Sequence, residues 1–451
     1  MYRQFMFIVA VCCIFIFVGC DREGDAADDE PEAAAEGAEE TRAEAQREDG
    51  GGADDAESGA ARADEREGEE PDEDDVAEWD DSELPEERGA VESNNIFAHE
   101  FFEYAGDKNV AFSPFSIASA MAMVYAGADG ETAAQLADTL EYGRGAVEDF
   151  GELTSTLDDK GEEDRLELDV VNDLWVDSGV QFGSAYLETL DRYFGADVTE
   201  LRFSSSPDRA RKRINDDVAE NTRGKIEELL SPPMVTRDTL SVLTNAIYFK
   251  GEWASPFDEQ KTHQARFEAP DEAVTVPMME QRQKLRIARG KGYEALEKEY
   301  VGGELAALVI LPNRGAFDEV EEELDADLFS EAVDGLSYRG LVDLKMPKFE
   351  VRQRFKLKRT LQEMGAERPF SPSADFHRIY RPFFLDKVVH EAVIEVDEKA
   401  TEAAAATAVT VTKGGPPKTY DFVVNRPFFF YIFDKPTGTI LFASRVLDPT
   451  E

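Results

Sequence analysis

Apolar residues recur along this chain with two periods, one of about 3.6 residues and one of two residues. The helical period predicts a helix that begins near residue 94, helices over 113–126, 131–140, 182–193 and 355–364, and a helical region over 210–230 that is broken by Gly224. Alternation predicts a strand over 166–176, and apolar strand-like runs predict strands over 240–249, 305–311, 342–349 and 388–396, followed by a hairpin of 428–433 and 439–446. Because helices and strands are interspersed without a repeat and without the regular order of a doubly wound sheet, the pattern predicts an α+β fold.

The composition of the chain changes sharply near residue 94. Residues 21–93 carry 32 acidic and 6 basic side chains, which is −26 of the formal net charge of −49. They include almost no aliphatic or aromatic residues, so they cannot bury enough apolar surface to offset chain entropy, and we predict a disordered acidic tether over 20–93. Residues 94–451 are rich in Phe, Val, Leu and Ile and are long enough for a folded domain. The acidic balance argues against nucleic acid and anionic lipid surfaces as partners.

The N-terminus has the features of a targeting signal. Arg3 precedes an apolar run over 5–18 that is too short for an ordinary membrane-spanning helix. The run ends in Phe17-Val18-Gly19-Cys20, which resembles the cleavage box of bacterial lipoproteins. We therefore expect 1–19 to be a signal peptide and Cys20 to carry lipid, with a plain secretory peptide or a signal anchor as alternatives. The protein would then lie in the cell envelope or outside the cell, held to a bacterial membrane by its lipid alone.

The cysteine content agrees with this assignment. Cys12, Cys13 and Cys20 are the three cysteines of the chain, so the globular part can form no disulfide.

A run of small residues over 398–408 lies between the strand predicted over 388–396 and a polar loop over 413–418. Four consecutive alanines favour a helix by propensity, so an exposed Ala-rich helix or loop is one interpretation. With a period of two, small residues fall on both faces, and they include Thr401, Ala403 and Ala405 on one face and Glu402, Ala404 and Ala406 on the other. A segment with such small side chains could enter a sheet without overpacking it.

The folded part contains no motif of a known catalytic centre. It has no Gly-x-Ser-x-Gly elbow, no His-Glu-x-x-His and no cysteine nucleophile, so we expect neither an enzyme nor a metal site or cofactor. The four histidines are scattered along the sequence, and His390 taken alone could be a base or a metal ligand.

Many separated motifs of the chain resemble those of the serpin superfamily, over about 94–449. They are Asn109-Val110-Ala111-Phe112-Ser113-Pro114-Phe115-Ser116-Ile117, Asn221-Thr222-Arg223-Gly224-Lys225-Ile226, Thr244-Asn245-Ala246-Ile247-Tyr248-Phe249-Lys250-Gly251-Glu252-Trp253, Met346-Pro347-Lys348-Phe349, Phe370-Ser371-Pro372-Ser373-Ala374-Asp375-Phe376, Lys387-Val388-Val389-His390-Glu391-Ala392, Arg426-Pro427-Phe428 and Gly438-Thr439-Ile440-Leu441-Phe442. One such motif would be weak evidence, but this number in the family's order makes the resemblance specific.

The resemblance implies a serpin-like domain over 94–451 with three β-sheets, about eight or nine helices and an exposed reactive loop. It also implies a suicide mechanism. A target protease attacks the loop, the hinge of the loop inserts as a new central strand of the main sheet, and the attached acyl-enzyme is dragged away and distorted. The residues that match the hinge are Glu398, Lys399, Ala400, Thr401, Glu402, Ala403, Ala404, Ala405 and Ala406. Ala400 stands where the family usually has Gly, so this hinge should turn less easily.

The resemblance also implies a gate in the main sheet. His390 matches a buried histidine of the region where the sheet opens, and it is expected to bond to Asn245 near Ser113 and Ser116. Trp175 matches the residue beneath the end of the sheet where insertion begins, although the position is equally compatible with an ordinary core aromatic.

Three positions are candidates for the bond that the protease attacks. The family's spacing places the residue before the cut at Gly414, which offers a specificity pocket little to hold. Lys413 suits a trypsin-like pocket with a carboxylate at its base, so Lys413–Gly414 is the preferred bond. Gly414–Gly415 and a cut near Val411 or Thr412 are alternatives, as is Lys413 being a solvated loop residue.

These features predict a monomeric inhibitor of serine proteases whose partner is a trypsin-like or subtilisin-like enzyme. A non-inhibitory serpin that acts as a binding or chaperone module is the alternative. Bulky or charged residues at inward-facing hinge positions would mark that alternative. Thr401, Ala403 and Ala405 argue against it, whereas Ala400 favours it weakly.

Overall fold

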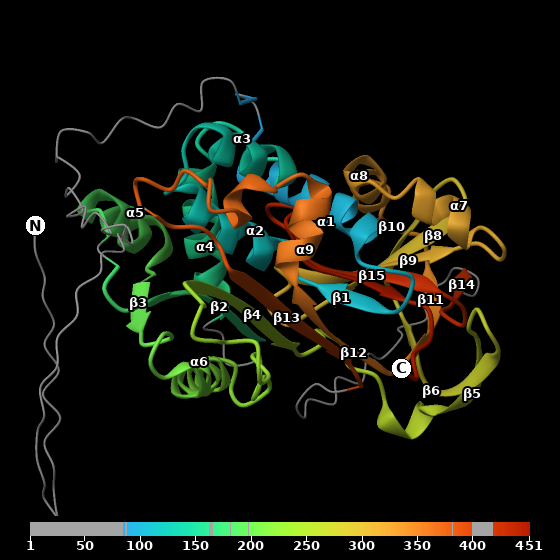
Figure 1. The fold of residues 1–451 in the computed structure, drawn as a ribbon. Coiled ribbons are helices and arrows are strands. Elements are labelled where there is room, and N and C mark those ends of the chain that lie inside the picture. Colours follow the sequence, from blue (N-terminus) through green and yellow to red (C-terminus); the bar gives the residue numbers. More distant parts are fainter. Residues whose placement is uncertain are drawn as a thin grey trace, which may run out of the picture. The chain divides into compact units, whose positions relative to one another are not determined.

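Three β-sheets and nine α-helices make up the part of the chain that the structure, a computed structural model, describes (Figure 1). The described residues are 84–85, 88–161, 166–180, 182–196, 198–380, 382–398 and 418–451. The predicted α+β class, with three sheets and eight or nine helices, is confirmed. The predicted signal peptide, Cys20 and most of the acidic tether lie outside the described residues. Within the described ranges, no helix is both long and apolar enough to cross a membrane.

The main sheet has five strands in the order β12, β13, β4, β2, β3. These strands are β12 (Phe349–Lys356), β13 (Lys387–Val396), β4 (Ser241–Gly251), β2 (Leu166–Asp177) and β3 (Val198–Leu201). β12 and β13 are antiparallel, as are β4 and β2, whereas the central pair of β13 and β4 is parallel. β3 pairs in parallel with β2 at one edge, so the sheet has two parallel pairs, of which β13 and β4 form the central one.

Different helices cover the two faces of the main sheet. α6 (Pro207–Asn221) packs its apolar side on the face that carries Trp175 and Val389. α2 (Pro114–Tyr125), every residue of which is buried, and α4 (Ala146–Gly161) lie on the opposite face. Because successive strand residues point to opposite faces, His390 faces α2 while its neighbours Val389 and Glu391 face α6.

α2 begins where the sequence places its start signals. The Oγ of Ser113, the N-cap residue, accepts a hydrogen bond of 3.0 Å from the backbone N–H of Ser116, and Pro114 occupies the first turn. The cap fixes the beginning of this helix against the centre of the main sheet.

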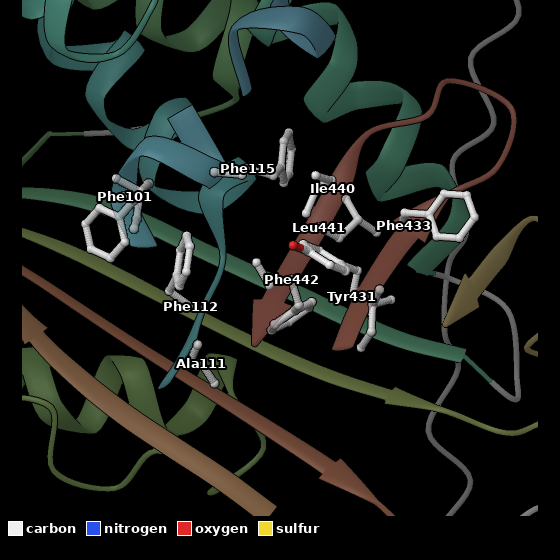
Figure 2. Close-up of a cluster of buried hydrophobic side chains, with 14 of the residues drawn as sticks. Phe101, Ala111, Phe112, Phe115, Tyr431, Phe433, Ile440, Leu441 and Phe442 are labelled. Carbon is white, nitrogen blue, oxygen red and sulfur yellow. The ribbon is translucent and has the colours of Figure 1, made fainter. Parts of the chain in front are cut away.

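A second sheet of seven strands has the order β1, β16, β15, β9, β8, β7, β10. Its first strands bring the two ends of the folded domain together, because β16 (Ile440–Val446) lies between β1 (Val110–Phe112) and β15 (Phe428–Asp434). Figure 2 shows the resulting core, in which Phe112 of the early segment lies near Phe442 of the C-terminal hairpin. The hairpin predicted over 428–446 is therefore present and central.

The remaining helices surround the sheets, and the remaining strands complete the second and third sheets. The helices are α1 (Ala90–Tyr104), α3 (Gly130–Thr139), α5 (Ser184–Phe194), α7 (Phe317–Glu322), α8 (Ala326–Asp334) and α9 (Leu357–Met364). The strands are β5 (His263–Glu268), β6 (Ala273–Gln283), β7 (Arg286–Arg289), β8 (Tyr293–Glu299), β9 (Leu305–Pro312), β10 (Ser337–Tyr338), β11 (Leu341–Pro347) and β14 (Thr419–Val423). The third sheet has the order β14, β11, β6, β5.

Two predicted elements are wrong in their extent. The helical region predicted over 210–230, with a break at Gly224, ends at Asn221 and does not resume, because Arg223 and Gly224 adopt left-handed backbone angles with φ of 53° and 75°. Ile226 beyond them is buried without being helical. The single strand predicted over 342–349 is two strands, because the chain leaves β11 at Pro347 and starts β12 of another sheet at Phe349.

Candidate functional site

The site lies along the parallel pair of β13 and β4, which we call the seam. Its register runs from Lys387 opposite Val242 to Val393 opposite Tyr248. From Ile394 onward β13 pairs only with β12, and from Phe249 onward β4 pairs only with β2, among the described residues. The two strands therefore part at the end of the seam that leads toward Glu398.

The centre of the seam is held by a polar cluster, the gate cluster, which consists of Ser113, Ser116, Asn245 and His390. His390 and Asn245 are direct register partners, and both are fully buried. The Nδ1 of His390 bonds to the Oδ1 of Asn245, and the amide nitrogen of Asn245 donates to the backbone carbonyl of Ser116 at 2.7 Å. The predicted association of these four residues is present in the structure.

The surroundings of His390 keep its ring neutral. Its Nε2 accepts a hydrogen bond of 3.1 Å from the backbone N–H of Ser113, so this nitrogen cannot carry a proton, and Nδ1 donates to Asn245 instead. Burial at the N-terminus of α2 lowers the pKa of His390 to about 3, against the opposing effect of the bond to Asn245. A neutral imidazole that bonds to both α2 and β4 is a structural element of the seam, not a base or a metal ligand.

The open end of the seam holds the first residue of the hinge. Glu398, which is 6% exposed, forms an ion pair of 2.6 Å with the Nζ of Lys348 and accepts a hydrogen bond of 2.6 Å from the Oγ1 of Thr262. Burial acts to raise the pKa of Glu398, but the hydrogen bonds from Lys348 and Thr262 outweigh it and hold the pKa below its usual value. The preceding carbonyl, that of Asp397, accepts a bond of 3.0 Å from the indole nitrogen of Trp253.

The expected position of Trp175 is not the one that the structure has. Trp175 is opposite Val242 in the register, at the start of the seam, and its indole nitrogen donates to the Oγ1 of Thr244 at 2.9 Å. β2 runs antiparallel to β4, so the end of β2 lies beside the beginning of β4. The tryptophan at the hinge end of the sheet is Trp253, which follows β4 directly.

Lys225 and Glu391 make further contacts that involve the strands of the seam. Lys225 bridges its open end, because its Nζ lies 5.6 Å from the ring centroid of Tyr248 on β4 and 3.6 Å from Glu395 on β13. The buried Glu391 of β13 pairs with Arg352 and Arg354 of β12, at 3.1 and 2.6 Å. If β4 and β13 separate, Lys225 must lose its contact with either Tyr248 or Glu395. The ion pairs of Glu391 join β13 to β12, so they can persist when those two strands move together.

The sequence did not predict roles for Trp253, Lys348, Thr262 or Lys225. Three of them stand inside motifs that carry the family resemblance, at 244–253, 346–349 and 221–226, and this was the available signal. Thr262 lies in no such motif and is found only through its contact with Glu398.

The hinge residues after Glu398 and the candidate bait residues lie outside the described residues. These are Lys399, Ala400, Thr401, Glu402, Ala403, Ala404, Ala405, Ala406, Lys413, Gly414 and Gly415. The structure describes the chain on both sides of them, up to Glu398 on β13's side and again from Lys418 before β14.

Comparison with known proteins identifies the family. A profile described as Serpin (serine protease inhibitor) matches residues 92–449. A serpin-like protein of Thermococcus kodakarensis is 36% identical over 376 residues, covering 81% of this chain and 87% of that protein. The mouse leukocyte elastase inhibitor A is 35% identical over 381 residues, covering 79% of this chain and 98% of that protein. The structure of thyroxine-binding globulin with thyroxine aligns with a TM-score of 0.70 at 29% identity, covering 80% of this chain and 99% of that one. The matched fold, the parallel seam and these relatives together show that the chain belongs to the serpin family of protease inhibitors.

Proposed function

We propose that this protein inhibits serine proteases by suicide trapping, in which the cleaved reactive loop inserts into the seam. The observation that carries the proposal is the parallel pairing of β13 and β4 beside the first hinge residue. A segment that leaves β13 at Val396 and folds back would run antiparallel to both neighbours. It would replace one parallel ladder by two antiparallel ones, which adds backbone hydrogen bonds and buried area.

The gate cluster supports a seam that is closed but can be opened. Its contacts are hydrogen bonds between His390, Asn245 and the N-terminus of α2, and such polar groups can form new bonds on either side of an inserted strand. A packed apolar seam would resist separation more strongly. The uninserted form would then be held kinetically, with the inserted form lower in free energy.

The sequence of the hinge supports inhibition over simple cleavage. Thr401, Ala403 and Ala405 are small at the positions that would face one side of the inserted strand. Lys413 supports a trypsin-like or subtilisin-like target, with Lys413–Gly414 as the bait bond, because an ammonium group is held by an acidic specificity pocket.

A direct test is incubation of the full chain with trypsin, subtilisin and elastase, followed by denaturing electrophoresis. An inhibitor of this type gives a covalent complex band that survives boiling in detergent. Complete cleavage of the loop by every enzyme, with full protease activity retained, would falsify the proposal.

A binding or chaperone module is the second candidate function. It has support from the thyroxine-binding globulin structure, which is a solved complex of this fold with a small ligand. Ala400 in place of Gly also favours it, whereas the small residues Thr401 and Ala403 favour inhibition. The electrophoresis experiment separates the two, because only the inhibitor forms a covalent complex.

The proposed place of action is the surface of a bacterial membrane. Cys20 would carry the lipid, and the acidic segment of about 70 residues would space the inhibitor some 45–50 Å or more from the membrane, by roughly 5–6 Å × √n. Trapping would then take place outside the cytoplasm, within reach of the anchor.

A further inference from the structure

Lys298 of β8 is an unusual residue because it is a lysine in the core beside the hinge. Its side chain is 2% exposed. Its Nζ donates to the backbone carbonyl of Ser255 at 2.6 Å and to the Oε1 of Gln281 at 2.8 Å. Within the described residues, no carboxylate lies within ion-pairing distance of this nitrogen, so its charge is balanced by neutral groups alone.

Two aromatic rings supply the rest of its surroundings. The Nζ lies 4.5 Å from the ring centroid of Phe257 and 5.1 Å from that of Trp253. A cation at these distances is attracted to the ring faces, and the attraction is larger in a desolvated site. A neutral amine keeps its hydrogen bonds to Ser255 and Gln281 but loses this attraction.

Trp253 connects Lys298 to the hinge. The indole stacks on Tyr300 with centroids 4.4 Å apart, and its nitrogen donates to the carbonyl of Asp397, directly before Glu398. The orientation of the indole therefore determines how firmly the base of the hinge is held.

We propose that Lys298 is a positioning residue for the hinge, whose ammonium group fixes Trp253 against Asp397 and whose deprotonation loosens that anchor. The proposal rests on the proposed loop insertion for its functional consequence, but not for its structural part. Protonated Lys298 favours the closed seam, and neutral Lys298 favours release of the hinge.

Lys298 changes its charge near neutral pH. Burial lowers the pKa of Lys298 to about 7, so both of its forms are populated near neutral pH. Gln281, which contacts it from β6, is uncharged and is held in place by bonds from its amide nitrogen to Ser255 and Pro256. The charged and titratable groups on the segments around it are Glu252, Asp258, Glu280, Arg282, Lys284, Arg286, Glu297, Glu299, Tyr300, Lys348, Asp397, Glu398 and Lys435.

Most of these charged groups have partners of their own. Glu280 pairs with Lys345, Arg282 with Asp343, Arg286 with Glu297, Glu299 with Lys435, and Lys348 with Glu398. None of these ion pairs involves Lys298, so burial is the cause that lowers its pKa.

The structural part is tested by tryptophan fluorescence of the full chain. The double variant Trp79→Phe/Trp175→Phe leaves Trp253 as the sole tryptophan of the three in the chain. We expect its emission to change between about pH 6 and about pH 8.5, with a midpoint near 7, and we expect Lys298→Met in that background to abolish the change. Lys298→Met keeps the length and apolar stem of the side chain. Lys298→Gln, which keeps a hydrogen-bond donor, is a second neutral variant and should also show no change.

The functional part is tested by the rate of covalent complex formation with one protease. At each pH the rate for the wild type is divided by the rate for Lys298→Met, so that the pH dependence of the protease cancels. We expect this ratio to rise at least about threefold toward unity between about pH 6 and about pH 8.5.

The outcomes are distinct. A Trp253 signal that is constant with pH in the wild-type background, or that persists in both neutral variants, overturns the role of Lys298. A signal that titrates beside a constant rate ratio overturns its coupling to the hinge. Failure to trap any protease contradicts the proposed function, while the fluorescence experiment still decides the role of Lys298 at Trp253.

Discussion

His390 and Asn245 lie directly opposite each other across the parallel seam, and together they link β13, β4 and the first turn of α2. His390 is neutral in this arrangement because its Nε2 accepts from a backbone N–H at the N-terminus of α2. A proton on Nε2 would break the hydrogen bond from Ser113, because two N–H donors would then face each other in a buried site.

The first prediction concerns acid stability. The pKa of His390 is lowered from 6.5 to about 3 in the folded protein, so the unfolded chain binds more protons between these values. The contribution of neutral His390 to the free energy of unfolding is therefore fully present above pH 6.5. It is lost as the pH falls toward 3, where the free energy of unfolding is lower by roughly 5 kcal/mol. Urea unfolding at a series of pH values measures it.

A control is needed because the pKa of His99 is lowered in the folded protein as well. Burial lowers the pKa of His99 to about 4, so it also destabilises the folded protein in acid. His390→Gln should show a shallower pH dependence than the wild type, and the difference isolates His390. Equal slopes for the two proteins would contradict the lowered pKa of His390.

The second prediction concerns the anchor of the hinge. Glu398→Gln keeps an acceptor for Thr262 but removes the charge that pairs with Lys348, which should lower the free energy of unfolding by about 1–2 kcal/mol. The matched control is Glu395→Gln, which removes the more exposed carboxylate three residues before Glu398. It should lower the free energy of unfolding by at most about 0.5 kcal/mol. Thermal unfolding compares them, and an unaltered midpoint for Glu398→Gln would show that the anchor contributes nothing.

The third prediction concerns the hinge. Thr401→Arg would place a charge on the face of the inserted strand that is expected to be buried, at a cost of several kcal/mol, and should convert an inhibitor into a substrate. Glu402→Arg, on the opposite face, is the control and should remain an inhibitor. Both should unfold at the wild-type temperature. If Thr401→Arg traps protease as well as the wild type does, Thr401 does not enter the sheet.

The fourth prediction concerns the bait. Lys413→Ala should reduce trypsin inhibition at least tenfold, which is about 1.4 kcal/mol in the barrier, and should spare inhibition of enzymes that prefer small apolar residues. Lys418→Ala, at the exposed residue before β14, should have no effect. Mass spectrometry of the released fragment should find Gly414 as its first residue. A fragment that begins at Gly415 would move the bait to Gly414.

The fifth prediction concerns the membrane. Cys20→Ser should abolish lipid attachment and leave the folded domain intact, whereas Cys13→Ser, inside the expected signal peptide, should leave the lipid in place. Metabolic labelling with a radioactive fatty acid and membrane fractionation measure both. Cys20→Ser protein that remains in the membrane with its signal removed would point to another anchor.

Pattern and family resemblance predicted much of the fold. Apolar strand-like runs over 240–249 and 388–396 predicted β4 and β13, and the resemblance placed His390 beside Asn245, as the structure has them. Periodicity failed at 222–230, because apolar residues at helical spacing there pack on the sheet after two left-handed residues end α6. Such residues satisfy the same apolar pattern in either conformation.

The two tryptophans show what the sequence could not establish. Trp175 and Trp253 both occur near the end of a strand, and the end of the sheet at which each lies depends on strand direction and register. β2 and β4 are antiparallel, which places Trp175 at the far end from the hinge. Strand direction comes from the tertiary fold, so the local pattern around each tryptophan is the same whichever end it occupies.

The position of β16 between β1 and β15 has a consequence for how the chain is made. Val110 pairs with Arg445, and Asn94 donates to the backbone carbonyl of Ile440 at 2.9 Å, so within the described residues β1 has its ladder partner near the C-terminal end of the domain. During synthesis β1 remains unpaired until β16 has been made, because contacts between residues so far apart in the sequence form late. The second sheet therefore closes only after β16 is made, and a truncation of the last dozen residues would remove β16 and leave β1 without its ladder partner.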